Sequence, residues 1–163
     1  LEELSKERVH KEKRSQNGII VKGIDNCLVK LSKCCNPVPG DEIIGYITRG
    51  RGVSVHRTNC VNTKKLLEEG NRIIDVYWSE NKKTAYSVDI EIYANDRSGL
   101  LADIINVLGN NKCTIIAVSS KATKEKIAMT ELTIEVENIE QLNNVLKALR
   151  KIDSVYEVKR KKQ

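Results

Sequence analysis

Aromatic side chains are scarce in this chain: among 163 residues it has no Phe, one Trp and five Tyr. We therefore expect aliphatic cores built from Ile, Val and Leu, without the large buried rings that dominate many cores. No apolar run approaches the roughly 18 to 20 residues of a membrane-spanning helix. The N-terminal segment, residues 1–14, is charged throughout and lacks the apolar stretch of a secretory signal. These absences predict a cytoplasmic protein with no membrane partner.

Catalytic motifs are also missing. The chain has no phosphate-binding glycine loop followed by Lys and Ser or Thr, and no paired histidines with carboxylates. We therefore expect that this chain is not itself an enzyme. Its five cysteines, an odd number, argue against a disulfide framework and favour metal binding or simple burial. Because the chain opens on Leu1 and not on Met, we expect a fragment of a longer protein.

The net charge of +6 is unevenly distributed along the chain. Residues 1–83 carry 16 basic and 11 acidic side chains, whereas residues 84–163 carry 12 and 11. The basic excess therefore lies in the first half, where it favours an anionic partner. Lysines on a solvated surface would explain the same excess.

The sequence pattern divides the chain into two modules. We predict a helical tail or linker over residues 1–17, a small β-rich domain over 18–78, a polar linker at 79–83 and a second domain over 84–163. In the first domain, β-branched runs between turn residues predict strands at 18–21, 27–31, 42–48, 53–56 and 72–78. A short helix is predicted over 60–69, capped by Asn59.

The second half alternates strands with helical periods. Strands are predicted at 86–93, 115–118, 129–136 and 155–158, and helices at 98–110, capped by Ser98, and 139–151. The order βαββαβ is that of the ferredoxin-like unit. The predicted fold class is therefore α+β, with a small β-rich domain of the zinc-finger type followed by a ferredoxin-like domain.

Three cysteines and a histidine lie close together in the first half. Cys34, Cys35, His56 and Cys60 offer three thiolates and one imidazole, the donor set of a closed tetrahedral zinc site. Adjacent cysteines on a strand point to opposite faces, so the turn residues Asn36-Pro37 are needed to bring both to one ion. Four protein ligands would make the zinc structural. Buried thiols and a redox pair remain alternatives, and we expect Cys27 and Cys113 to be core thiols.

Five basic residues surround these strands and the turn at Gly50–Gly52: Lys30, Lys33, Arg49, Arg51 and Arg57. Arginines on a glycine-rich turn can reach phosphates, and such binding would be salt-sensitive. Tyr46 is the only aromatic residue among them, so stacking on bases is poorly supported. RNA binding and a solvated surface both fit this pattern.

The loop between the first strand and helix of the second domain is also a candidate site. It comprises Asn95, Asp96, Arg97, Ser98, Gly99, Leu100 and Leu101. Backbone amides at the start of a helix can receive a carboxylate. A βα loop with a good helix cap is the simpler interpretation.

The motifs Cys34-Cys35-Asn36-Pro37-Val38-Pro39-Gly40-Asp41, Gly45 to His56 and Asn59-Cys60 closely resemble the zinc-finger or ribosome-intersubunit domain of the RelA/SpoT homologues. The second half resembles the ACT domain that ends those proteins. The resemblance covers about residues 18–160. It implies that Cys34, Cys35, His56 and Cys60 bind zinc. It also implies that the arginines dock on ribosomal RNA near the A-site tRNA.

The resemblance further implies that the chain regulates upstream domains that make and hydrolyse (p)ppGpp in the stringent response. The parent would be a GTP diphosphokinase and (p)ppGpp pyrophosphohydrolase. An alternative is an amino-acid sensor, because ACT domains bind amino acids at the loop that contains Asp96. Edge-to-edge pairing of two ACT domains would give a homodimer. A thiol enzyme is a third hypothesis, and it would need an exposed cysteine with a depressed pKa.

Overall fold

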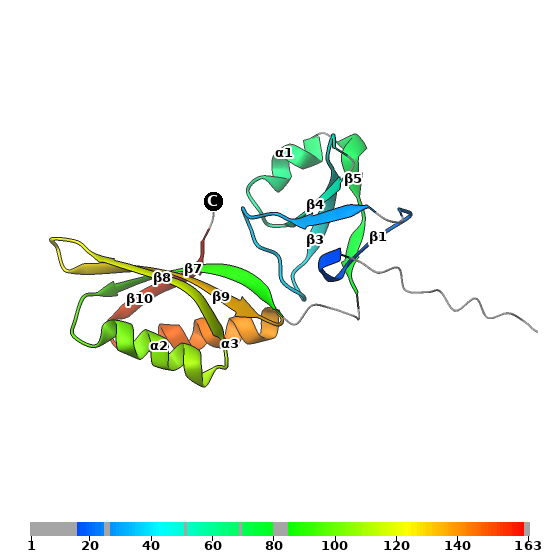
Figure 1. The fold of residues 1–163 in the computed structure, drawn as a ribbon. Helices are drawn as coiled ribbons and strands as arrows, with labels where there is room; N and C mark the ends of the chain where they lie inside the picture. The colour runs from blue at the N-terminus through cyan, green and yellow to red at the C-terminus, as the bar shows by residue number, and fades with distance from the viewer. Residues whose placement is uncertain (1–15, 25–26, 51, 69, 80–84, 162–163) are drawn as a thin grey trace, which may run out of the picture.

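The computed structural model describes residues 16–24, 27–50, 52–68, 70–79 and 85–161, which form two modules (Figure 1). The first is rich in short strands, and the second combines long strands with two helices, which confirms the predicted α+β class. The tail predicted over 1–17 lies outside the described residues except for Gln16 and Asn17, as does the predicted linker except for Ser79. Among the described residues, no helix is long and apolar enough to cross a membrane.

The first module is built from short pairings around a small four-stranded sheet. Strand β4 pairs with β2 in parallel and with β3 antiparallel, and β5 completes the order β2-β4-β3-β5. Strands β1 and β6 form a separate pair. The elements are η1 (Gln16–Gly18), β1 (Ile19–Val21), β2 (Leu28–Leu31), β3 (Ile43–Ile47), β4 (Gly52–Arg57), α1 (Thr63–Glu68), η2 (Gly70–Arg72), β5 (Ile73–Ile74) and β6 (Val76–Trp78).

Two predictions about the first module were wrong. The strand predicted over 72–78 is split at Asp75, because β5 pairs with β3 and β6 pairs with β1 in the other sheet. The helix predicted over 60–69 begins only at Thr63, so Asn59 does not cap it. The intervening chain turns first: the Cys60 amide and the Thr63 hydroxyl both donate to the Arg57 carbonyl.

The second module confirms the predicted βαββαβ order. Its elements are β7 (Tyr86–Asn95), α2 (Leu100–Asn110), β8 (Thr114–Ala122), β9 (Ile127–Val136), α3 (Ile139–Arg150) and β10 (Val155–Arg160). The antiparallel sheet has the order β10-β7-β9-β8, and α2 and α3 lie side by side beneath it (Figure 1). Every second residue of β7 and β9 is buried, as the alternation predicts. The Ser98 cap was wrong: α2 is capped by Gly99, whose φ of 79° suits glycine.

A loop of the first module packs into the second module. This loop, Cys34–Asp41, is called the cysteine loop below. Val38 is fully buried and belongs to the core of the second module, and the carbonyl of Pro39 accepts a 2.7 Å hydrogen bond from the amide of Ile139. Gly40 has a φ of 101°, and a Cβ there would overlap the side chain of Ile139. The start of α3 therefore fixes the path of the cysteine loop.

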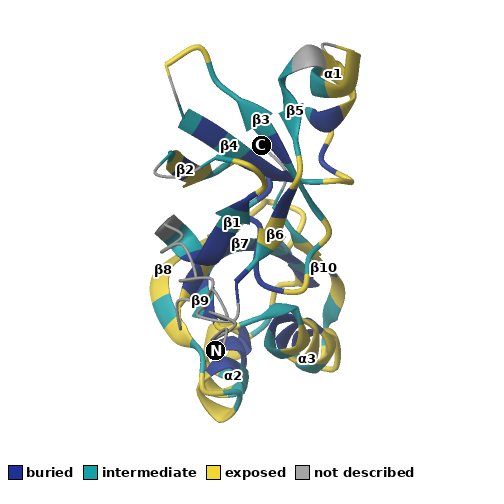
Figure 2. Cartoon of the chain, turned by 90° about the vertical axis from the view of Figure 1, so that its right-hand side faces the viewer, coloured by how far each residue is buried: buried dark blue, intermediate teal, exposed yellow. Residues whose placement is uncertain are grey.

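Polar contacts join the same surfaces. The Asp41 carboxylate accepts a 3.1 Å salt bridge from Arg160, and both side chains are about nine-tenths buried, at 10% and 11% exposed. The Arg160 guanidinium also donates to the carbonyls of Cys35 and Asn36. Trp78 donates from its indole to the Asp41 carbonyl, and its ring meets that of Tyr86 edge-on. Buried residues therefore continue from one module into the other (Figure 2).

Candidate metal centre and basic surface

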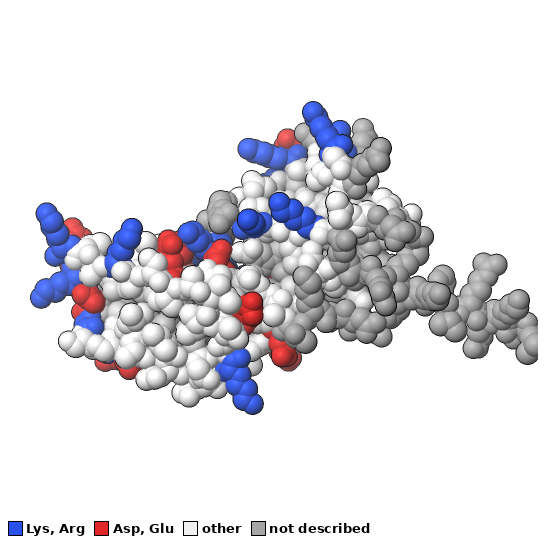
Figure 3. Space-filling model, viewed as in Figure 1, with Lys and Arg blue, Asp and Glu red and all other residues white. Residues whose placement is uncertain are grey.

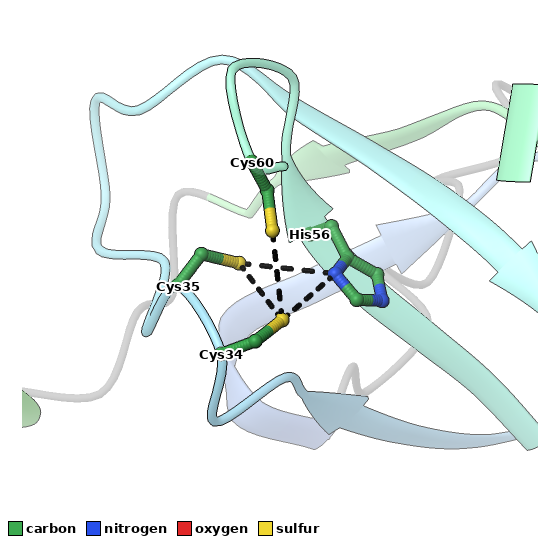
Figure 4. Close-up of side chains that lie close together, drawn as sticks. All are labelled: Cys34, Cys35, His56 and Cys60. Atoms are coloured by element: carbon green, nitrogen blue, oxygen red, sulfur yellow. Dashed lines mark hydrogen bonds between the residues drawn. The ribbon is translucent and has the colours of Figure 1, made fainter. Parts of the chain in front are cut away.

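The four predicted donors converge at the base of the cysteine loop. Figure 4 shows their side chains pointing toward one another. The Cys34 sulfur lies 3.3 Å from His56 Nδ1, 3.6 Å from the Cys60 sulfur and 3.9 Å from the Cys35 sulfur. The Cys35 sulfur lies 3.9 Å from His56 Nδ1. All four donor atoms lie within 4.8 Å of one another.

These separations fit a single tetrahedral ion. With metal–sulfur bonds of about 2.3 Å and a metal–nitrogen bond of about 2.0 Å, tetrahedral geometry places sulfurs about 3.8 Å apart and nitrogen about 3.5 Å from sulfur. A disulfide would need sulfurs about 2.05 Å apart, so the 3.6 to 3.9 Å sulfur separations describe free thiols. The cluster can therefore hold a metal ion, with no ligand position left over for chemistry.

The backbone explains how adjacent cysteines share one site. Strand β2 ends at Leu31, and the amides of Cys35 and Asn36 both donate to the Ser32 carbonyl. Asn36 then takes a φ of 42°, in the left-handed region that Asn tolerates well. The chain has thus left the extended form at Cys34 and Cys35, as the sequence argument required.

Neighbouring groups orient the donors. The Ser32 hydroxyl lies 3.0 Å from His56 Nε2, which turns Nδ1 toward the thiols. Such outer partners fix the ring orientation of metal-binding histidines. The amide of Arg57 donates to the Cys35 sulfur at 3.3 Å, which suits a thiolate. Sequence reasoning missed Ser32, although a hydroxyl two residues before Cys34 was a usable signal.

Burial shapes the acidity of the donors. It lowers the pKa of His56, which favours the neutral imidazole that binds metals. It raises the pKa of Cys35 to about 12, so this thiol stays protonated until a cation enters. Burial also acts to raise the pKa of Cys60, but hydrogen bonds, first from the Asn62 amide and then from the neighbouring thiols, lower it overall. Metal binding must therefore release protons.

The other two cysteines lie apart from this cluster. Cys27 is half-buried against the core of the first module, and Cys113 is half-buried against the core of the second. Burial raises the pKa of the Cys113 thiol. Neither residue is exposed, and the raised pKa of Cys113 is the opposite of what a reactive cysteine needs.

The predicted basic residues are spread along the β3–β4 hairpin and the neighbouring strand β2. Arg49 is exposed at the tip of the hairpin, whereas Arg57 pairs with Ile43 at its other end. Arg57 lies five strand positions from Gly52, or about 17 Å. Lys30 and Lys33 are exposed on and just after β2, and Arg51 lies outside the described residues. Lys and Arg side chains project from the first module in Figure 3.

The loop Asn95–Leu101 is held mainly by Arg97. Its guanidinium donates to the carbonyls of Asp153 and Ser98 and pairs with Asp103. Asn95, Asp96, Ser98 and Gly99 are exposed, Leu101 is 41% exposed, and Leu100, the first residue of α2, is buried.

Comparison with known proteins divides the chain in the same way. The model of the RelA/SpoT RIS domain matches residues 19–79, and that of an ACT domain matches residues 82–160. The chain is 42% identical over 161 residues to a GTP pyrophosphokinase of Haemophilus influenzae, covering 96% of this chain and 22% of that protein.

Other relatives give the same result. The chain is 40% identical over 143 residues to the "Bifunctional (p)ppGpp synthase/hydrolase RelA" of Mycobacterium tuberculosis, covering 88% of this chain and 19% of that protein. It thus spans about a fifth of the length of these relatives. A crystal structure of the ACT domain from the GTP pyrophosphokinase of Chlorobium tepidum is 27% identical, with a TM-score of 0.43, over 47% of this chain and 99% of that one. With a RIS domain followed by an ACT domain, the chain belongs to the RelA/SpoT family.

Proposed function

We propose that this chain is the non-catalytic C-terminal regulatory region of a stringent-response (p)ppGpp synthetase/hydrolase. In this proposal it docks on ribosomal RNA near the A-site tRNA and controls catalytic domains elsewhere in the parent protein. The observation that supports the proposal is the share of the relatives that the chain covers. Its RIS and ACT domains together span about a fifth of the length of a protein named GTP pyrophosphokinase. A GTP pyrophosphokinase needs catalytic domains, and neither matched domain is one.

Zinc is the ion that we propose for the cluster, because three thiolates and one imidazole in tetrahedral separation suit zinc over harder cations. With four protein ligands, the ion would act structurally. It would tie the cysteine loop to β4 and to the turn before α1, on either side of the hairpin that carries Arg49. Elemental analysis of the purified chain should give about one zinc per molecule.

The docking proposal is tested by co-sedimentation of the chain with ribosomes at several salt concentrations. Replacing Arg49 and Arg51 together by Ala should weaken binding, because each lost phosphate contact lowers the slope of log affinity against log salt by about 0.7 to 0.9. Lys112→Ala, an exposed charge in the second module, is the matched control. If the double variant and the wild type have the same affinity and the same salt dependence, Arg49 and Arg51 are solvated surface residues and not RNA contacts.

A second candidate function is pairing of two ACT domains, with or without an amino acid. Strand β8 is at the edge of the sheet, and it exposes Ile116 and Val118 at 53% and 38%. The neighbouring helix α2 exposes Leu101 and Ile105 at 41% and 42%. These apolar side chains favour a second copy of the chain as the partner. The loop Asn95–Leu101 at the start of α2 would then receive an amino-acid carboxylate near the joint.

A further inference from the structure

A pocket lies between the two modules and borders the metal cluster, because Cys34, Cys35 and Cys60 are among its lining residues. It has a volume of about 360 Å³, within the range of small-molecule sites. One wall comes from the first module, including Arg57, Asn59 and Val61, and the other from α3 and β10. Sequence reasoning missed this pocket, because its two walls lie about ninety residues apart in the chain.

Four cationic side chains line this pocket: Arg57, Arg150, Lys159 and Arg160. No carboxylate is among its lining residues. Lys159 is paired with Glu91 and Glu157, and Arg160 with Asp41. No ion pair of Arg57 or Arg150 occurs in the described part of the chain, and the Arg150 guanidinium donates to the Val158 carbonyl. The guanidinium groups of Arg57 and of the exposed Arg150 thus have no carboxylate partner among the described residues.

Buried nitrogen atoms also lack partners here. The Nε atoms of Arg57 and Arg160 are both buried and donate no hydrogen bond to any described residue. Such atoms usually mark a missing water or ion. Arg57 and Arg160 line the same pocket, so an anion bound there would lie beside both guanidinium groups.

A metal in the cluster would lower the local positive charge, because three thiolates and a divalent ion together carry one negative charge. Arg57 and Arg150 would still have no carboxylate partner among the described residues. Guanidinium groups bind phosphate oxygens through paired hydrogen bonds. The lining residues include no aromatic side chain on which a base could stack. The lining side chains of this pocket therefore suit phosphate groups and offer no stacking surface for a nucleobase.

We propose that the pocket between the modules binds a small molecule carrying two or more linked phosphate groups, held by Arg57 and Arg150 with Arg160 behind them. The volume exceeds that of a single phosphate. Both modules contribute cations, so such a ligand would clamp the ACT domain to the cysteine loop. Arg57 is also one of the proposed RNA-contact residues, so the test of this inference uses Arg150, which is not one of them.

The test is a titration of the full chain with inorganic pyrophosphate, followed by calorimetry and by NMR of the arginine Nε–Hε groups. Arg150→Gln should weaken binding at least about tenfold, because it removes a charged hydrogen-bond partner. Arg150→Lys should restore part of the affinity, and Lys147→Gln, an exposed cation on the same helix, should leave it unchanged. Metal content is measured before and after each titration, since pyrophosphate also binds metal ions.

Several results would overturn the proposal. These are no binding at about 10 mM pyrophosphate, equal binding by the wild type and Arg150→Gln, or equal losses in Arg150→Gln and Lys147→Gln. A single-stranded RNA that displaces pyrophosphate at a lower phosphate concentration would also overturn it, and would assign the pocket to an RNA backbone. Arg57→Gln gives an independent check from the other wall, provided that its metal content matches the wild type.

Discussion

The two modules reach stability by different routes. Among the described residues, the core of the ACT domain has 18 buried residues, whereas that of the RIS domain has six, all Ile or Val. The described RIS strands are two to six residues long, but β7 and β9 each run for ten. A domain of about 60 residues buries a smaller fraction of its surface than a larger domain does and is marginally stable. We infer that the RIS domain needs its metal, while the ACT domain folds on hydrophobic burial.

The difference has an unexpected exception. One of the 18 residues in the ACT core is Val38, which the RIS domain contributes through the cysteine loop. The segment that carries two of the metal ligands is therefore also an anchor in the neighbouring core. The cysteine loop thus carries metal ligands and also packs against the ACT domain. Variants that remove the metal and variants that remove the packing contacts can therefore be compared.

Metal removal should have the largest effect. In Cys60→Ser, or after chelation, we expect residues 19–79 to lose most of their amide protection, because the binding energy of a structural metal is also folding energy. Residues 86–160 should stay protected, with some loss around Val38 and Ile139. Hydrogen exchange resolved by segment measures both. Cys113→Ser is the control, since that thiol lies outside the cluster. Undiminished protection over 19–79 would show that the RIS core suffices alone.

Loss of the buried ion pair between the modules should come next. Arg160→Gln leaves the Asp41 carboxylate buried without its cation, although the Val38 amide still donates to it at 2.9 Å. We expect a cost of about 3 kcal/mol in the free energy of unfolding, measured by urea denaturation. Asp41→Asn combined with Arg160→Gln should recover part of it.

The control for that variant is Lys161→Gln, whose partly exposed pair with Glu131 should contribute less than about 1 kcal/mol. If Arg160→Gln and Lys161→Gln cost the same, the two modules are joined by apolar packing alone, and the polar contacts of the cysteine loop only set its path.

The smallest effect on folding is expected for Ile105→Lys on α2. This side chain is 42% exposed, so the variant should change the unfolding free energy by less than about 0.5 kcal/mol. It should nevertheless shift the mass measured by light scattering from dimer to monomer, if the exposed face of the ACT domain pairs with a second copy. Asn106→Lys, an exposed neighbour on the same helix, is the matched control. If Ile105→Lys and the wild type have the same mass, β8 and α2 do not pair with a second copy of the chain.

Much of the fold could be predicted because local pattern and tertiary role agree. The alternation over 86–93 marks β7, and its buried face is the face that the helices cover. The metal donors could be predicted from chemistry, since few arrangements use three thiols and an imidazole so close in sequence. By contrast, the split between β5 and β6 depends on which partner strand each residue meets, which no local pattern encodes.

The contact between the two modules could not be predicted from the sequence either. Asp41 and Arg160 are 119 residues apart in the sequence, and neither residue alone indicates the other. The local sequence around each residue indicates no buried ion pair. Only the packing of the cysteine loop against β10 brings them together and excludes water from the pair.

The contact between Arg160 and the Cys35 carbonyl joins two residues that are synthesised at different times. It spans 125 residues of sequence. At the usual synthesis rates of about 5 to 20 residues per second, Cys35 emerges about 6 to 25 s before its partner. During this interval the thiols are present without the strand that covers their loop. A newly made chain must therefore take up its metal, or keep its thiols reduced, before the second domain can close over them.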